Sequence, residues 1–96
     1  MMVRLAELEI DPTQLTAYLG FLREEIEASL ALERGVRMLK AVSLRDAPSM
    51  VRLLEVYESP EAYEAHIRSP HFLKYKVGTA HMVLSLRLLD ADPIAL

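Results

Sequence analysis

Two Ser-Pro dipeptides, ten residues apart, constrain the fold of this chain more than any other feature. They begin at Ser59 and Ser69 in the stretch SPEAYEAHIRSPHFLKYK, residues 59–76. A serine side chain can cap a helix, and proline fits the first helical position, where no backbone N–H is needed. The stretch therefore predicts two short consecutive helices with a bend near Ser69. We expect the bend to direct three side chains toward one wall of a pocket, namely His66, His71 and Tyr75.

The N-terminal third predicts a strand followed by a long helix. Residues 3–10 alternate weakly between apolar and polar, which is typical of a strand. Asp11, Pro12 and Gln14 then provide a cap, a first-turn proline and a capping-box glutamine. A stripe of apolar residues at helical spacing follows and predicts a helix that stops near Gly35. The stripe consists of Leu15, Leu19, Leu22, Ile26 and Leu30.

The remaining segments predict three more strands. Residues 36–44 and 50–57 are two of them, joined by a turn at residues 45–48, and residues 81–89 are the last before a short tail. With the paired helices, the order is strand, helix, strand, strand, helices, strand. Short connections and right-handed crossovers favour a four-stranded antiparallel sheet with helices on one face, an α+β fold.

The composition is typical of one domain, residues 1–96, that associates with a second copy. The chain is 52% hydrophobic, although a lone domain of this size buries only about two-thirds of its unfolded surface. The last strand carries apolar residues on both faces, with Leu84 and Leu86 on one side and Val83 and Leu89 on the other. An open sheet with one solvated face would alternate more cleanly. We therefore expect one face to pack on the helices and the other on a partner subunit.

Other classes of protein are disfavoured. The net charge is −3, and the basic residues are scattered, so the electrostatic basis of nucleic-acid binding is missing. No apolar run approaches the roughly 18 residues of a membrane span, and no secretory signal is evident. The chain has no cysteine, which excludes disulfides, thiolate catalysis and zinc–cysteine sites. These features predict a cytoplasmic location and no contact with membranes.

Several polar residues are candidates for a site, and each has a plain structural alternative. His66 is either a catalytic group or a half-buried histidine bonded to a backbone carbonyl. Glu55 and Tyr57 share one face of a strand, where a carboxylate among apolar residues must be hydrogen-bonded or shifted in pKa. The alternative for Glu55 is an ion pair at the rim of the fold. The tyrosines at 57, 63 and 75 could line a cavity for a flat ring, or could simply pack.

No cofactor site is evident in the sequence. His66 and His71 are separated by the predicted bend, and no set of His, Asp and Glu has metal-ligand spacing. No glycine-rich loop is present for a phosphate or a dinucleotide. Ser29 and Ser43 lack the motif of a catalytic serine. The sequence thus predicts neither a metal nor an organic cofactor.

Four segments resemble the antibiotic biosynthesis monooxygenase domain family, and together they span most of the chain. Ser29, Glu33 and Gly35 are similar to its helix exit, and LLEVYES at 53–59 resembles its strand motif, with Tyr57 where tryptophan is commoner. AHIRSPHFLKY at 65–75 is similar to its most recognisable motif. The ending MVLSLRLLDADPI resembles the small quinol monooxygenases of the family.

This resemblance implies a ferredoxin-like βαββαβ subunit that pairs into a dimeric α+β barrel. It also implies a mostly apolar pocket between sheet and helices, in which relatives oxidise phenols or hydroquinones with molecular oxygen and without metal or flavin. A heme-degrading branch places its histidine ligand where this chain has Lys76, and its catalytic tryptophan where this chain has His66. Heme degradation is therefore disfavoured.

These considerations lead to one main hypothesis, a monooxygenase that acts on a small quinol-like aromatic without a cofactor. Ionising a phenol of pKa about 10 at neutral pH costs about 4 kcal/mol, and one charge-assisted hydrogen bond returns about 1.5–3 kcal/mol. At least two donors are thus needed. His66 is the predicted base, Glu55 orients a neighbour, and the residues expected to bind and polarise the substrate are Tyr57, His71 and Tyr75.

Two alternatives stay open. The first is an isomerase of a small hydroxyketone, in which Glu55 and His66 move a proton and no oxygen is consumed. The second is a dimeric small-molecule-binding module without catalytic activity.

Overall fold

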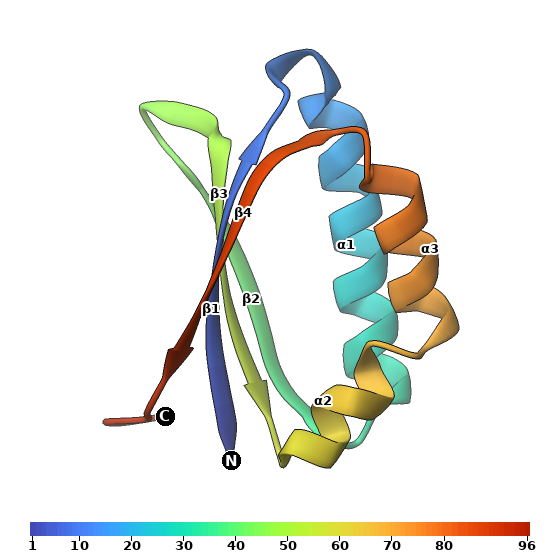
Figure 1. The fold of residues 1–96 in the computed structure, drawn as a ribbon, viewed down its shortest axis with the longest axis vertical. Coiled ribbons are helices and arrows are strands. Elements are labelled where there is room, and N and C mark those ends of the chain that lie inside the picture. Colours follow the sequence, from blue (N-terminus) through green and yellow to red (C-terminus); the bar gives the residue numbers. More distant parts are fainter.

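One four-stranded antiparallel sheet carries all the helices on a single face in the computed structural model, which describes residues 1–96 (Figure 1). The strand order is β2-β3-β1-β4, so β2 and β4 are the edges. The elements are β1 (Met2–Ile10), a short 3-10 turn (Pro12–Gln14), α1 (Leu15–Leu32), β2 (Val36–Leu44), β3 (Ala47–Tyr57), α2 (Pro60–His66), α3 (Pro70–Thr79) and β4 (Val83–Ala91). This arrangement confirms the predicted α+β, ferredoxin-like βαββαβ fold.

The predicted caps begin the helices where the sequence indicates. The Ser59 hydroxyl accepts a hydrogen bond from the backbone N–H of Ala62, and the Ser69 hydroxyl accepts one from that of Phe72. Each serine is followed by proline at the first helical position. The chain therefore leaves α2 at Ile67 and begins α3 at Pro70, which confirms the bend.

Three predicted boundaries are wrong by a few residues. Helix α1 ends at Leu32 rather than near Gly35. Strand β3 begins at Ala47, because Leu44 pairs with Ala47 and leaves a turn of only two residues. Pro48 is tolerated there since β1 pairs with β3 only from Met50 onward, so no ladder partner is lost. Strand β4 runs from Val83 to Ala91, because β1 pairs with it along this whole length.

The register of the sheet separates an inner face, toward the helices, from an outer face. Leu8 of β1 lies opposite both Val51 of β3 and Leu86 of β4, so these three side chains share the inner face. The main core lies between this face and α1 and consists of Ala6, Leu8, Ile10, Tyr18, Leu22, Val51, Leu53 and Met82. A bulge between Glu9 and Ile10 shifts the start of β4, which places Val83 opposite Ile10.

The outer face carries no helix (Figure 1). Leu5 lies opposite Leu54 on this face and is 40% exposed. Beside it, Glu7 forms ion pairs with Arg52 and Arg87. The expectation that a second subunit covers this face stays a prediction. No helix is long and apolar enough to cross a membrane.

Candidate active site

A cavity of about 460 Å³ lies between the inner face of the sheet and the helices. This volume is within the usual range of small-molecule sites, about 300–1,000 Å³. The cavity has two contrasting sides. We call Glu25, His66, Phe72 and Tyr75 the helical wall, and Leu84, Leu86 and Leu88 the strand wall. The helical wall carries ionisable groups, whereas the strand wall is entirely aliphatic.

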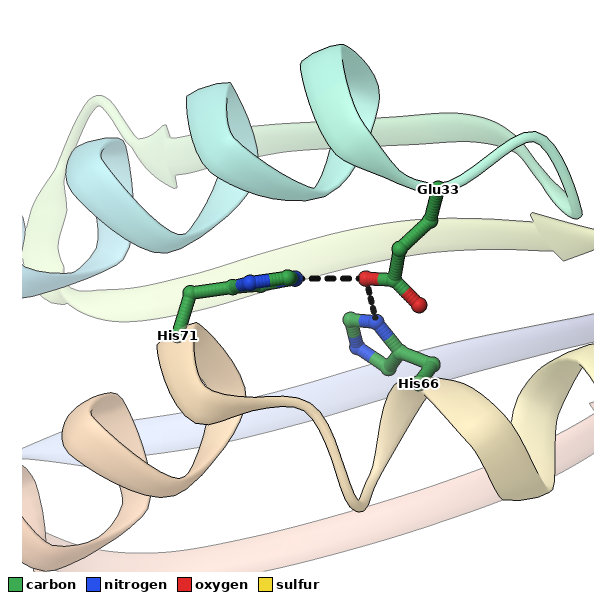
Figure 2. Close-up of side chains that lie close together, drawn as sticks. All are labelled: Glu33, His66 and His71. Carbon is green, nitrogen blue, oxygen red and sulfur yellow. Dashed lines mark hydrogen bonds and ion pairs between the residues drawn. The ribbon is translucent and has the colours of Figure 1, made fainter.

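His66 is the most completely buried ionisable side chain of the helical wall, with 2% of its surface exposed. Both of its ring nitrogens contact carboxylates. Nδ1 lies 2.9 Å from Oε2 of Glu33, and Nε2 lies 3.3 Å from Oε1 of Glu25. The same Glu33 oxygen lies 2.6 Å from Nε2 of His71, so the two imidazoles approach one carboxylate oxygen from different helices (Figure 2).

We call these four residues the histidine–glutamate cluster: Glu25, Glu33, His66 and His71. The local sequence determines where each one lies. Ser29 follows Glu25 by one helical turn, and its hydroxyl donates to the Glu25 carboxylate at 2.8 Å. Glu33 is the C-cap of α1 and has an extended backbone, and its side chain points to the gap between α2 and α3 (Figure 2). The bend at Ser69 then places the two histidines on either side of that carboxylate.

The two carboxylates of the cluster are shifted in opposite directions. Burial raises the pKa of Glu25, and the Ser29 hydrogen bond and the charge of His66 offset this only in part. Burial also acts on Glu33, but the hydrogen bonds from His71 and His66 outweigh it and lower its pKa. The carboxylate at the cavity therefore holds a proton more readily than the one farther from it.

Glu55 and Tyr57 are neighbours on β3, as the sequence predicts. The Tyr57 hydroxyl donates to the Glu55 carboxylate, so Glu55 has this hydroxyl as its partner and not the ion pair that was its structural alternative. Glu55 lines the cavity, whereas Tyr57 is fully buried behind it, with its ring centroid 5.3 Å from that of His66. Burial and the nearby Glu55 charge raise the pKa of Tyr57, so this phenol remains protonated at neutral pH.

Tyr75 also lines the cavity, but its hydroxyl is engaged with another tyrosine. The hydroxyl oxygens of Tyr75 and Tyr18 are 2.7 Å apart, and the rings meet edge to face. Burial raises the pKa of both phenols. Tyr75 therefore shapes the helical wall and remains a neutral group.

Of the residues predicted to form the site, three line the cavity: Glu55, His66 and Tyr75. The other two do not reach the cavity: Tyr57 contacts the lining residues Glu55 and His66 from behind, and His71 bonds Glu33, which is itself outside the lining. The His66 ring does not bond a backbone carbonyl, as its structural alternative proposed; it forms a hydrogen bond with Glu33 and an ion-pair contact with Glu25.

Sequence reasoning missed the role of Glu25 and gave Glu33 no function. A helical stripe identifies a buried face, but an acidic residue near that stripe is most often solvated, so Glu25 gave no signal. The one available sign was Ser29 a turn later, which can bond a buried carboxylate. Two cations at the cavity, Arg4 and Lys76, were also missed. Arg4 lies over the Tyr63 ring at 4.6 Å and pairs with Asp90.

Three residues of the cluster form a set of metal-ligand types that the sequence did not predict. Ligand atoms of Glu33, His66 and His71 all lie within 4.8 Å of one another, because the fold brings together residues 33 and 38 positions apart. Their separations of 2.6 and 2.9 Å are hydrogen-bond lengths. Two ligands of a tetrahedral zinc ion with bonds of about 2.1 Å would be about 3.4 Å apart. The cluster thus has the residue types of a metal site but the spacing of groups that share protons.

The fold and the cavity define a ferredoxin-like α+β domain with an ionisable pair in an apolar pocket. The family model of the antibiotic biosynthesis monooxygenases matches residues 1–77. The chain belongs to this family, which confirms the resemblance inferred from its motifs. No curated protein matches the sequence.

Solved structures agree with this assignment. A structure from Bacteroides thetaiotaomicron, which is assigned as an antibiotic biosynthesis monooxygenase, is 49% identical to this chain and has a TM-score of 0.97. The match covers 98% of this chain and 90% of that one. One from Lactobacillus acidophilus, assigned as a monooxygenase, is 28% identical with a TM-score of 0.89; the match covers 91% of this chain but only 41% of that one. One from Nitrosomonas europaea is 19% identical with a TM-score of 0.92 over 99% of this chain and all of that one, a likeness of fold alone.

Proposed function

We propose that this protein is a cofactor-independent monooxygenase that oxidises a quinol or phenol-like small aromatic with molecular oxygen. The observation that carries the proposal is the Glu25–His66 pair in the wall of a largely apolar cavity. Membership of the antibiotic biosynthesis monooxygenase family and the similarity to the B. thetaiotaomicron structure support it.

The first requirement is ionisation of the substrate hydroxyl. At neutral pH this costs about 4 kcal/mol for a phenol of pKa about 10. Glu25 or His66 would accept the proton, since both line the cavity. Arg4 and Lys76 line it too, and their charges would stabilise the phenolate, each contact supplying about 1.5–3 kcal/mol. These cations take the stabilising role that the sequence gave to Tyr57 and His71.

The second requirement is the transfer of electrons to oxygen. A phenolate can give one electron to O₂, which yields an aryloxyl radical and superoxide. Their recombination forms a C–O bond and a hydroperoxide, and loss of water leaves a new carbonyl. For a hydroquinone, C₆H₆O₂ and O₂ give the hydroxyquinone C₆H₄O₃ and H₂O, so the substrate supplies all four electrons. The proton taken at the start is needed again when the O–O bond breaks.

The strand wall would serve this chemistry by packing on the aromatic ring and excluding water. Leu84, Leu86 and Leu88 are all at least 44% exposed, although they are on the inner side of the sheet. A bound ring would cover them. Apolar burial contributes about 25 cal/mol per Å², so these leucines favour a flat apolar ligand over a sugar or a phosphate ester.

An oxygen electrode tests the proposal directly. The purified protein would be given benzene-1,4-diol, methyl-substituted benzenediols and naphthalene-1,4-diol, with a protein-free sample to correct for spontaneous oxidation. We expect consumption of one O₂ per quinol without accumulation of hydrogen peroxide for at least one of them, and loss of this activity in His66→Ala. The His81→Ala variant is the matched control, since His81 is exposed and outside the cavity. Equal rates in His66→Ala and the native protein would refute the Glu25–His66 pair as the site of proton transfer.

One observation favours a second candidate, an isomerase of a small hydroxyketone. Two carboxylates, Glu25 and Glu55, line the same cavity as His66, and an enolisation needs one group to remove a proton and another to return it. Turnover of a hydroxyketone under argon at the rate seen in air would favour this candidate. Tight binding of aromatics without turnover of either substrate class would leave the third alternative, a binding module.

We further propose that the protein is a homodimer and acts in the cytoplasm. The support for a dimer is the outer face of the sheet, where no helix packs and the apolar side chains of Leu5 and Val42 are left exposed. Light scattering on the protein as it elutes from a size-exclusion column should give twice the mass of the 10.9 kDa chain. A Leu5→Glu substitution should then return the mass to that of one chain, and a single-chain mass for the native protein would contradict the proposal.

A further inference from the structure

We infer that the histidine–glutamate cluster is a proton path that connects the cavity to solvent, with Glu33 and His71 as its outer half. The inference rests on the proposed function for the origin of the proton, and it assigns roles to two residues that do not touch the cavity. The four groups follow one another without a gap. Glu25 meets His66, His66 meets Glu33, and Glu33 meets His71, at 3.3, 2.9 and 2.6 Å.

The burial of the cluster has a direction. The side chains of His66 and Glu25 are 3% and 5% exposed, whereas those of His71 and Glu33 are 14% and 15% exposed. Only the first two line the cavity. This chain of contacts, one ion pair and two hydrogen bonds, therefore begins at a ligand that would fill the cavity and ends at groups that water can reach. The leucines of the strand wall offer no group that can accept a proton from a bound ligand.

Each transfer along this path balances. The substrate O–H bond breaks as a proton joins the Glu25 carboxylate, which passes it to Nε2 of His66. The imidazole releases the proton on its other nitrogen, Nδ1, to Oε2 of Glu33, and Glu33 passes a proton to Nε2 of His71. His71 loses a proton to solvent. The reverse sequence returns a proton when water is formed, so no group gains or loses charge over a full cycle.

The shared oxygen of Glu33 is the observation that favours a path over a set of structural bonds. A carboxylate that merely fixed two histidines could use one oxygen for each. Instead both imidazoles contact Oε2, which is the arrangement that lets one oxygen accept a proton from one ring and donate it to the other. Neither Glu55 nor Tyr75 continues the path, because Glu55 is bonded to Tyr57, and Tyr75 to Tyr18.

The kinetic test uses His71→Ala in the full-length protein with naphthalene-1,4-diol and oxygen. We expect the turnover rate to fall about tenfold in a weakly buffered solution, with an unchanged KM because His71 does not contact the cavity. Added imidazole should restore most of the rate, since a small base can fill the space left by the ring and accept the proton. His81→Ala should show neither effect. A loss of rate that imidazole does not restore would show a structural role and overturn the inference.

A second measurement tests the proton path without any turnover of a quinol. A failure of the inference can therefore be told apart from a failure of the proposed function. The ring nitrogens of both histidines are followed by ¹⁵N NMR across the pH range without substrate. Groups that share protons titrate together, so the titration of His71 should appear in the Nδ1 shift of His66. In Glu33→Gln this coupling should vanish, while the other resonances should remain those of the folded protein. Independent titration of the two rings in the native protein would overturn the inference.

Discussion

The two sides of the cavity differ in chemistry and in how completely the fold determines them. On the side of the helical wall, every residue of the histidine–glutamate cluster has a hydrogen-bond partner. No buried polar side-chain atom in the protein lacks one. The strand wall is formed by leucines of an edge strand that nothing in the subunit covers. One wall is thus prepared before a ligand arrives, whereas the other gains its contacts from the ligand. This division assigns proton transfer to the helical wall and apolar affinity to β4.

The largest expected effect comes from removing the imidazole of the helical wall. His66→Ala should lower kcat for a quinol by about 10²- to 10⁴-fold, the usual contribution of general acid–base catalysis. KM should change little, because the leucines of the strand wall remain. Steady-state oxygen uptake measures both constants. If His66→Ala instead raised KM and left kcat unchanged, His66 would contribute to binding and not to catalysis, which would contradict the roles assigned to the two walls.

The next effect concerns the packing that holds the helical wall in place. Gly35 lies two residues after Glu33 and packs against α2, where an added Cβ would be 2.5 Å from the Cβ of Ala62. Gly35→Ala should therefore lower the free energy of unfolding by about 1–3 kcal/mol. Gly20→Ala on α1 is the matched control, since an added Cβ there meets nothing within 4 Å. It should stabilise the helix by about 0.5–1 kcal/mol. If urea denaturation gave the same change in the free energy of unfolding for both variants, α2 would not be closely packed against Gly35.

A smaller effect concerns the buried carboxylate at the cavity. Burial raises the pKa of Glu25, so the folded state retains a proton that the unfolded chain loses above about pH 4.3. Its contribution to stability therefore falls as the pH rises from that value through the folded pKa. Glu25→Gln removes this loss, and its melting temperature at neutral pH should exceed that of the native protein by a few degrees.

The pH dependence of that difference has a definite sign. Glu33 acts in the opposite sense, since its lowered pKa adds stability that is lost as the pH falls below the unfolded value. The advantage of Glu25→Gln should thus shrink on acidification, while the loss due to Glu33 remains in both proteins. Glu9→Gln, at an exposed position of β1, is the control. A lower melting temperature for Glu25→Gln at neutral pH would contradict the stated shift.

The smallest effect is expected on the strand wall. Leu86→Ala should raise KM for a quinol about three- to tenfold by loss of apolar contact, with kcat and melting temperature nearly unchanged. Leu44→Ala is a fair control, because Leu44 is exposed to a similar degree and lies outside the cavity. A large fall in kcat for Leu86→Ala would show that the strand also positions the reacting group.

The two walls also differ in how far the sequence predicts them. The two serine caps and the bend follow from local rules, because hydrogen bonds within a few residues determine them. The order of the elements along the chain follows from equally local patterns. The same rules placed His66 and Tyr75 at the cavity. They could not show that Glu33 bonds both histidines, since the contact spans 33 and 38 residues and depends on how α1 packs on the later helices.

The missed residues have a common physical reason. Glu25 and Arg4 are charged side chains, and a charge on an amphipathic helix or a strand is usually solvated. Their burial beside the cavity depends on partners from other elements, namely His66 for Glu25 and Tyr63 for Arg4. The small errors at the ends of α1, β3 and β4 likewise reflect strand pairing, which a local pattern does not contain.

The most direct test is a crystal structure with 2-naphthol, a phenol that resembles the proposed substrates and cannot follow the quinol reaction. The ring should lie between the two walls, in contact with Leu86 and Leu88, and its hydroxyl should be within hydrogen-bond distance of Glu25 or His66. A cavity closed by its own side chains, or a phenol bound elsewhere with His66 turned from it, would contradict the account.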